Sequence, residues 1–180
     1  MAAQDNLKSA AITALDATPP RRPTAGQEGG GAYLYDVVGI VGPTTNGATT
    51  GGILRAVRVP SNAIIRDIMY AQKAATTTAS FDFGAYYSTG NDGTTTANSG
   101  LVIDADYFAT AVNTAAVINW TSIMFEATTV DATDAVTPLW QALGLSEDPG
   151  GFIDIVAVNK ATIDGAATLA VRVQYVMAAQ

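Results

Sequence analysis

Alternation of apolar and polar residues predicts β-strands along most of the chain. In the last stretch, inward positions are predicted at Leu169, Val171, Val173 and Tyr175, and outward positions at Thr168, Ala170, Arg172 and Gln174. A second alternating run predicts a half-buried strand, with Phe81, Phe83, Ala85 and Tyr87 inside and Asp82, Gly84, Tyr86 and Ser88 outside. A period of two residues is the period of a strand with one buried face.

Other strands are predicted at 53–59, 64–71 and 152–159, the first two joined by a turn at Pro60-Ser61-Asn62. The segment 33–41 is apolar at both odd and even positions, including Tyr33 and Tyr35. A strand of that kind is buried on both faces, or buried on one and covered by a neighbour on the other. Residues 113–131 are ambiguous, with one strand predicted around 123–127.

Helix signals are short. Thr137 as the cap, Pro138 in the first helical position and Gly144 at the end predict a helix over 137–145, with Leu139 and Leu143 facing inward. A second helix, of one or two turns, is predicted from Asp104 to Val112. Asn91-Asp92-Gly93 lies in a predicted turn.

Residues 1–31 differ in composition from the rest. A short helix over 7–15 is followed by Pro19-Pro20-Arg21-Arg22-Pro23, which favours an extended backbone, and then by Gly26 and Gly29 to Gly31. We expect an N-terminal arm at 1–31 attached to one domain at 32–180. The seven or eight short strands predict an all-β fold, an antiparallel β-sandwich of jelly-roll-like or immunoglobulin-like form with one or two short helices.

The charge balance excludes two classes of partner. The chain of 180 residues has 9 Lys and Arg against 16 Asp and Glu, a formal net charge of −7. Nucleic acids and anionic membranes both require concentrated positive charge, so we expect neither as a partner. Charged residues are only 14% of the chain. That is typical of a protein with partner-covered faces, and equally of a threonine-rich β protein.

The residue types that most enzymes use are scarce. The chain has no cysteine and no histidine, so thiolate chemistry and the commonest general base are absent. No secretory signal and no apolar run of membrane-spanning length is found, which predicts a soluble protein. We expect no cofactor and no enzymatic activity.

Candidate chemical sites each have a simpler structural interpretation. Asp104 and Asp106 could form an acid pair, but capping and stabilising a helix start explains both. Asn91-Asp92-Gly93 lacks the remaining acids of a calcium loop, and Glu147-Asp148 follows a helix end as a solvated loop. No serine lies in a hydrolase motif, and no glycine run has phosphate-binding spacing.

Four residues are candidates for contact with a protein partner. Arg21 and Arg22, stiffened by prolines, could dock on an acidic partner or serve as a solvated linker. Tyr33 and Tyr35 belong to the apolar strand, where packing is a commoner role than carbohydrate stacking. Arg55 and Arg58 have opposite parity, so they should face opposite sides, and at least one should pair with an acid or an interface.

Three blocks of sequence, in order, resemble a known family. They are GGILRAVRVPSNAIIRDI at 51–68; FGAYYS at 83–88 with Asp92-Gly93 and VIDADYFA at 102–109; and LWQALGL at 139–145 with Asp148-Pro149-Gly150. Together they resemble small head proteins of tailed bacteriophages, of the capsid decoration or cement type. The likeness covers roughly 33–177. It implies a jelly-roll-like sandwich, a homotrimer, clamped over joints between subunits of the major capsid protein.

The resemblance therefore predicts a non-enzymatic virion protein, made in the host bacterial cytoplasm and bound to the outer surface of the capsid. Two other functions stay open from the residues alone. One is another virion component, such as a tail, neck or fibre-base protein. The other is a carbohydrate- or receptor-binding β-sandwich module.

Overall fold

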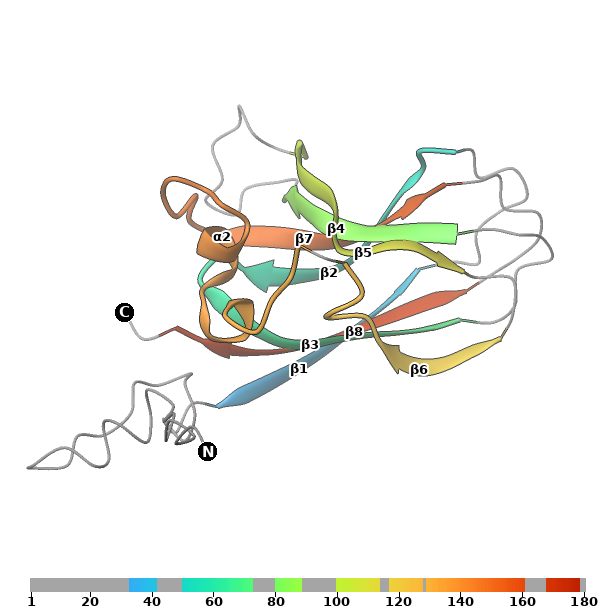
Figure 1. Cartoon of the computed structure of the whole chain (residues 1–180), viewed down its shortest axis with the longest axis horizontal. Helices are drawn as coiled ribbons and strands as arrows, with labels where there is room; N and C mark the ends of the chain where they lie inside the picture. The colour runs from blue at the N-terminus through green and yellow to red at the C-terminus, as the bar shows by residue number, and fades with distance from the viewer. Residues whose placement is uncertain are drawn as a thin grey trace, which may run out of the picture.

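The computed structural model describes residues 33–41, 50–72, 80–88, 100–113, 117–127, 129–160 and 168–178. Eight strands form two four-stranded sheets, which lie one above the other in Figure 1. The first sheet has the order β1 (Leu34–Val41), β8 (Leu169–Met177), β3 (Ala63–Gln72), β6 (Ile118–Ser122). The second has the order β2 (Ile53–Pro60), β7 (Phe152–Asn159), β4 (Ser80–Tyr87), β5 (Val102–Asn113).

All strand pairs are antiparallel, and consecutive strands alternate between the two sheets except at β4–β5, which pair within the second sheet. This confirms the predicted all-β antiparallel sandwich, and the strand order is jelly-roll-like. The predicted arm at 1–31 and the turn at Asn91-Asp92-Gly93 lie outside the described residues.

The core fills the space between the sheets. Inward side chains of both sheets are fully buried, among them Ile68, Phe83, Ile155 and Val173. Aromatic contacts link the layers, since the ring centroids of Tyr70 and Phe83 are 5.4 Å apart. Alternation predicted β8 correctly, because Leu169, Val171, Val173 and Tyr175 are all buried. The bounds predicted for β7 match the structure, and those for β2 and β3 agree within a residue.

The half-buried assignment of β4 is wrong, because this strand is buried on both faces. Asp82 and Tyr86, predicted to be outside, are 3% and 6% exposed. β4 is a central strand between β7 and β5. At Gly84 an added Cβ would lie 2.2 Å from the carbonyl oxygen of Asp104, so the β5 backbone passes directly over this residue.

The helix predicted from Asp104 to Val112 is wrong, because the segment is part of strand β5. Its pairing with β4 has three register shifts, and four residues separate Asp104 from Ala109 where only one separates their partners. These bulges break the period of two and produced a spacing that imitates a helix. Asp104 caps no helix; its Oδ1 accepts a bond from the backbone N–H of Asp106 at 3.2 Å.

The strand predicted around 123–127 is displaced, because β6 ends at Ser122 and 124–127 form turns. The helix predicted over 137–145 shortens to α2 (Leu139–Ala142), at the left end of the sandwich in Figure 1. Thr137 has an extended backbone, which is usual for the residue before a proline. Pro138 is extended as well and is the N-cap of α2, so the helix begins one residue later than the predicted first position. Gly144 does end the helix with a left-handed φ of +71°, as predicted. The only other helical turn in the described residues is η1 (Asp134–Val136).

The edge strand β1 lies against β2 at a point without a side chain. A Cβ on Gly39 would lie 1.8 Å from the carbonyl oxygen of Ala56, which belongs to β2. Ala56 is the extra residue of a β-bulge between Arg55 and Val57. Glycine at position 39 therefore allows the two sheets to meet along this side of the sandwich.

Gly39→Ala should lower the free energy of unfolding by roughly 1–3 kcal/mol, because the new methyl group meets rigid backbone. Urea denaturation measures the change. The control is Val38→Thr, an outward-facing substitution of similar shape, which should change the free energy by no more than about 0.5 kcal/mol. Equal stability of the Gly39→Ala variant and the original chain would contradict the close contact.

Candidate functional site

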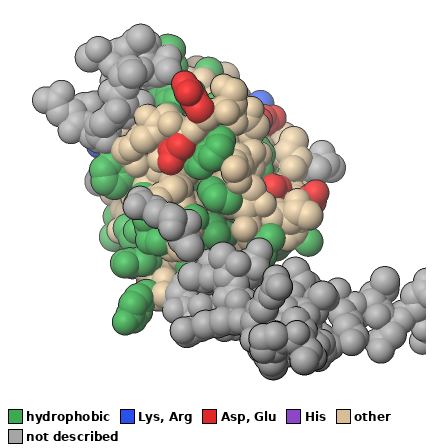
Figure 2. All heavy atoms as spheres, turned by 90° about the vertical axis from the view of Figure 1, so that its left-hand side faces the viewer, with side chains coloured by type: hydrophobic (Ala, Val, Ile, Leu, Met, Phe, Trp, Pro, Cys, Tyr) green, Lys and Arg blue, Asp and Glu red, His purple; other side chains and the backbone are tan. Residues whose placement is uncertain are grey.

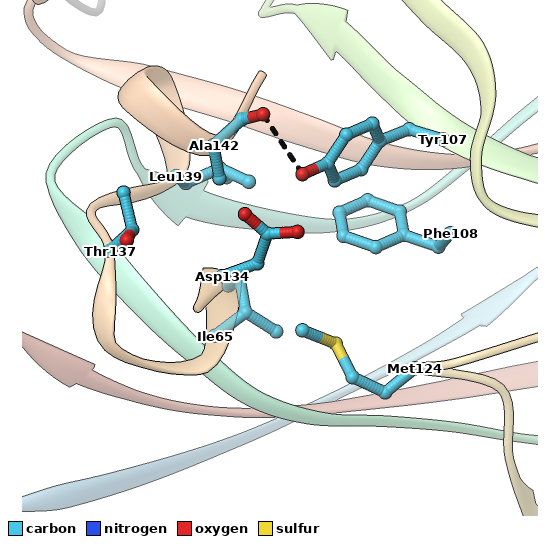
Figure 3. Close-up of a pocket in the computed structure, with 8 residues that line it drawn as sticks. All are labelled: Ile65, Tyr107, Phe108, Met124, Asp134, Thr137, Leu139 and Ala142. Carbon is cyan, nitrogen blue, oxygen red and sulfur yellow. Dashed lines mark hydrogen bonds between the residues drawn. The ribbon is translucent and has the colours of Figure 1, made fainter. Parts of the chain in front are cut away.

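A cavity between β5, α2 and η1 is too small for a substrate. It has a volume of about 10 Å³, room for about one water molecule. Figure 3 shows its lining, in which Tyr107 and Phe108 of β5 face α2, η1 and Met124. The Tyr107 hydroxyl donates a bond of 2.9 Å to the carbonyl oxygen of Ala142. Burial, and then the charge of Asp134, raise the pKa of Tyr107, so this phenol stays protonated and joins β5 to α2.

Asp104 and Asp106, the candidate acid pair, lie on the edge strand β5. The hydrogen bond with Asp104 is the main cause that raises the pKa of Asp106, which is exposed. Neither residue lines the cavity of Figure 3 or a hollow of about 280 Å³ near Tyr70 and Glu126. Among the described residues, no group of three His, Cys, Asp or Glu could hold a metal ion.

Two arginines converge on one buried acid on the outer face of the second sheet. Asp154 is 2% exposed and accepts bonds from Arg55 at 2.8 Å and from Arg58 at 2.6 and 3.1 Å. Arg55 also lies over the Tyr86 ring, 5.5 Å from its centroid. The predicted pairing with an acid is confirmed. The predicted opposite orientation is wrong, because the bulge at Ala56 brings both side chains to the same face.

A second buried acid is balanced in the same way. Asp82 Oδ2 lies 2.6 Å from Nζ of Lys160, and its Oδ1 accepts the backbone N–H of Ala111 at 2.8 Å. The hydrogen bond to Asp82 raises the pKa of Lys160. Ala111 has a left-handed φ of +52° within β5. This acid therefore fixes an irregular point of the strand, which is a structural role.

One exposed apolar surface of the described structure follows β1. We define the β1 face as Leu34, Val38 and Ile40, the even positions of the strand, which are 57%, 50% and 70% exposed. The odd residues Val37, Gly39 and Val41 are partly buried against the core. One face of the strand is thus packed and the other is open. The expected burial of one face is confirmed, and the expected cover of the other face is not seen in the described chain. A strand apolar on both faces with one face open is typical of a surface that a partner covers.

A charged pair lies in the middle of this apolar surface. Asp36 points to the same side and is bound by Arg172 of β8, whose Nε donates to both carboxylate oxygens at 2.9 Å and whose Nη2 donates to Oδ2. Gln174 donates a further bond to Asp36 at 3.3 Å. The guanidinium of Arg172 is the main cause that lowers the pKa of Asp36. The two charges of the pair cancel, so Asp36 and Arg172 together add no net charge to the β1 face.

Of the four predicted contact residues, Tyr33 lies just before β1, and Tyr35 lies at an odd position of β1, opposite to this face. Tyr33 is 85% exposed, and Tyr35 is 45% exposed while its ring stacks on Tyr175 at 5.2 Å. Tyr35 therefore packs against the Tyr175 ring and is still partly exposed to solvent. Arg21 and Arg22 lie outside the described residues. The sequence analysis did not identify Val38 and Ile40 as exposed. Their even positions, which alternate with the odd positions of the buried side, indicated that they point away from the core.

Figure 2 looks onto the end of the sandwich that carries α2. Hydrophobic side chains reach the surface over much of this end, next to acidic ones, and Lys and Arg show little. Phe125 and Tyr33 are among the exposed apolar side chains of the described residues.

No described helix is long and apolar enough to cross a membrane.

By fold, the chain is a two-sheet antiparallel β-sandwich whose accessible surface includes an open apolar strand. It is similar to a chain of the solved structure described as the cyanophage Pam1 capsid asymmetric unit, with a TM-score of 0.50. The two are 15% identical, over 97% of this chain and 99% of that chain. At that identity the likeness shows the fold. No protein-family model and no curated protein matches the chain.

The Asp36–Arg172 pair gives a testable dependence on pH. Its lowered pKa means that Asp36 stabilises the fold above the ordinary pKa of aspartate and loses this contribution as the pH falls. Arg172→Met should raise the pKa of Asp36, measured by NMR titration of its carboxyl carbon. Gln174→Ala should raise it less, because the bond from Gln174 is the weaker influence. An unchanged pKa in Arg172→Met would contradict the pairing.

Proposed function

We propose that this protein is a non-enzymatic structural component of a bacteriophage virion, a decoration or cement protein on the outside of the head. The observation that carries the proposal is the open β1 face on a sandwich with the fold of a capsid chain. A monomeric soluble protein rarely leaves such a strand uncovered, and shell proteins are covered by their neighbours. The order of the three sequence blocks supports the decoration type.

The mechanism is added contact area. Each protomer binds across neighbouring subunits of the major capsid protein, so that separating those subunits also requires breaking the bridging contacts. We further propose a homotrimer, because three linked copies bind a symmetric shell through high effective concentration even when each attachment is weak.

The β1 face should be required for attachment to the shell. Ile40→Lys places a charge in the apolar surface and should weaken binding to empty heads of the parent phage about tenfold or more, since an unpaired charge is costly to bury. Cosedimentation with tailless heads measures this. Gln141→Lys adds the same charge at an exposed position of α2 and should bind like the original chain.

Thermal unfolding of both variants must first show that they are folded. Equal binding of Ile40→Lys and Gln141→Lys would overturn the role of the β1 face. Absence of the original chain from purified tailless heads, together with its presence in complete virions, would instead favour a tail, neck or fibre-base component.

Arg21 and Arg22 are proposed as a second attachment point, in an arm that precedes the sandwich. Replacing both with alanine should leave the melting temperature of the sandwich unchanged and weaken binding to empty heads, because guanidinium groups bind carboxylates of an acidic partner strongly. The binding should also weaken as salt increases, and the variant should lose that dependence. Undiminished binding would show that the arginines serve only solubility.

A further inference from the structure

The four edge strands of the two sheets differ in how they are protected from pairing with another chain. β6 has only five residues and a register shift opposite Tyr70 and Gln72. β2 has the bulge at Ala56 and ends at Pro60. β5 has three register shifts and a left-handed Ala111. Short length, bulges and proline are the devices by which proteins prevent edge strands from pairing.

β1 has none of these devices. Its eight residues pair with β8 in continuous register from Leu34 to Val41 without a shift. It contains no proline and no lysine. Its one charged residue, Asp36, is held by Arg172 and so does not act as a free repelling charge. No described strand pairs with its other edge, so within the described part of the chain this edge presents a regular row of backbone N–H and C=O groups.

We propose that β1 binds an extended segment of a capsid-shell protein by β-strand addition, an inference that rests on the proposed function and names its partner contact. The groups left open along this edge repeat every two residues, and only another extended backbone matches that spacing. The incoming strand would lengthen the first sheet to five strands. The β1 face would then continue onto the partner as one apolar surface.

The side chains define the chemistry of the incoming segment. On the side of Leu34, Val38 and Ile40 it should carry apolar residues, because neighbouring side chains on one face of a sheet pack together. Next to Asp36 it should be neutral or basic, since like charges directly opposite each other destabilise a strand pair. A second copy of this chain is a poorer occupant of this edge, because each copy has a formal charge of −7, a repulsion that the proposed trimer has to offset by contacts elsewhere on the sandwich.

Hydrogen exchange of the β1 amides tests strand addition directly. In the free chain, amides that point to β8 should exchange slowly, and every second amide from Leu34 to Val41, which points to the open edge, should exchange fast. When the full chain is bound to empty heads of the parent phage, this fast set should slow roughly tenfold or more. Amides of the β6 edge should be unaffected and serve as the internal reference.

Each outcome decides between distinct explanations. Binding to the heads with slowed exchange of the open-edge amides supports strand addition. Binding with those amides still fast overturns it and leaves the proposed function standing. No binding at all means that the proposed function itself fails. Slow exchange in the free chain that disappears on dilution would show that a second copy occupies the edge, which also overturns the proposal.

A pair of substitutions gives an independent test. Val37→Pro and Val38→Pro remove adjacent amides, of which one points to β8 and the other to the open edge. The one at the open edge should leave the chain folded and reduce binding to the heads at least tenfold, clearly more than alanine at the same position, which keeps the backbone amide and shortens only the side chain. Equal loss for alanine and proline would point to side-chain contact alone, against strand addition. If the proline variant does not fold, the exchange experiment decides.

Discussion

The contact between the two sheets along the side of β1 and β2 determines much of what the surface of this protein can do. Gly39 leaves room for the carbonyl oxygen of Ala56, and the bulge that contains Ala56 turns both Arg55 and Arg58 toward Asp154. A single extra residue in β2 thus affects both how the two sheets meet and how Arg55 and Arg58 are arranged around Asp154. The same closure anchors β1 by its odd residues and leaves its even residues open.

The ionic interactions of the described residues serve the fold. Asp154 and Asp82 are both nearly buried, and each has a cationic partner within 2.8 Å. Removing a partner from a buried charge is strongly destabilising, so these acids are better explained as fixed points of the sheet than as reactive groups. On the β1 face the Asp36–Arg172 pair has a further effect, because it makes a mixed polar and apolar surface electrically neutral.

A neutral, apolar and regular edge is a hazard for an isolated protein and an advantage for a component of an assembly. The other edges of this sandwich are short, bulged or end in proline, and β1 is long and regular. The difference between β1 and the other three edge strands is observed within one molecule, so it needs no comparison with edge strands of other proteins. It connects the proposed attachment to a shell with a specific mode of binding through the backbone.

By itself, the sequence determined the fold class, the bounds of β7 and the alternation of β8, because in β8 a period of two leaves one consistent way to bury apolar residues. It also indicated that an arginine of β2 would find an acid, and that Gly144 would end a helix. Only the tertiary structure decided the rest. The bulges in β2 and β5 reversed the predicted parity of Arg55 and Arg58 and turned the predicted helix at Asp104 into a strand. The central position of β4 buried Asp82 and Tyr86, and the edge position of β1 exposed Leu34, Val38 and Ile40. Local periodicity contains no information on which strands become neighbours, and neighbours decide whether a second apolar face is covered.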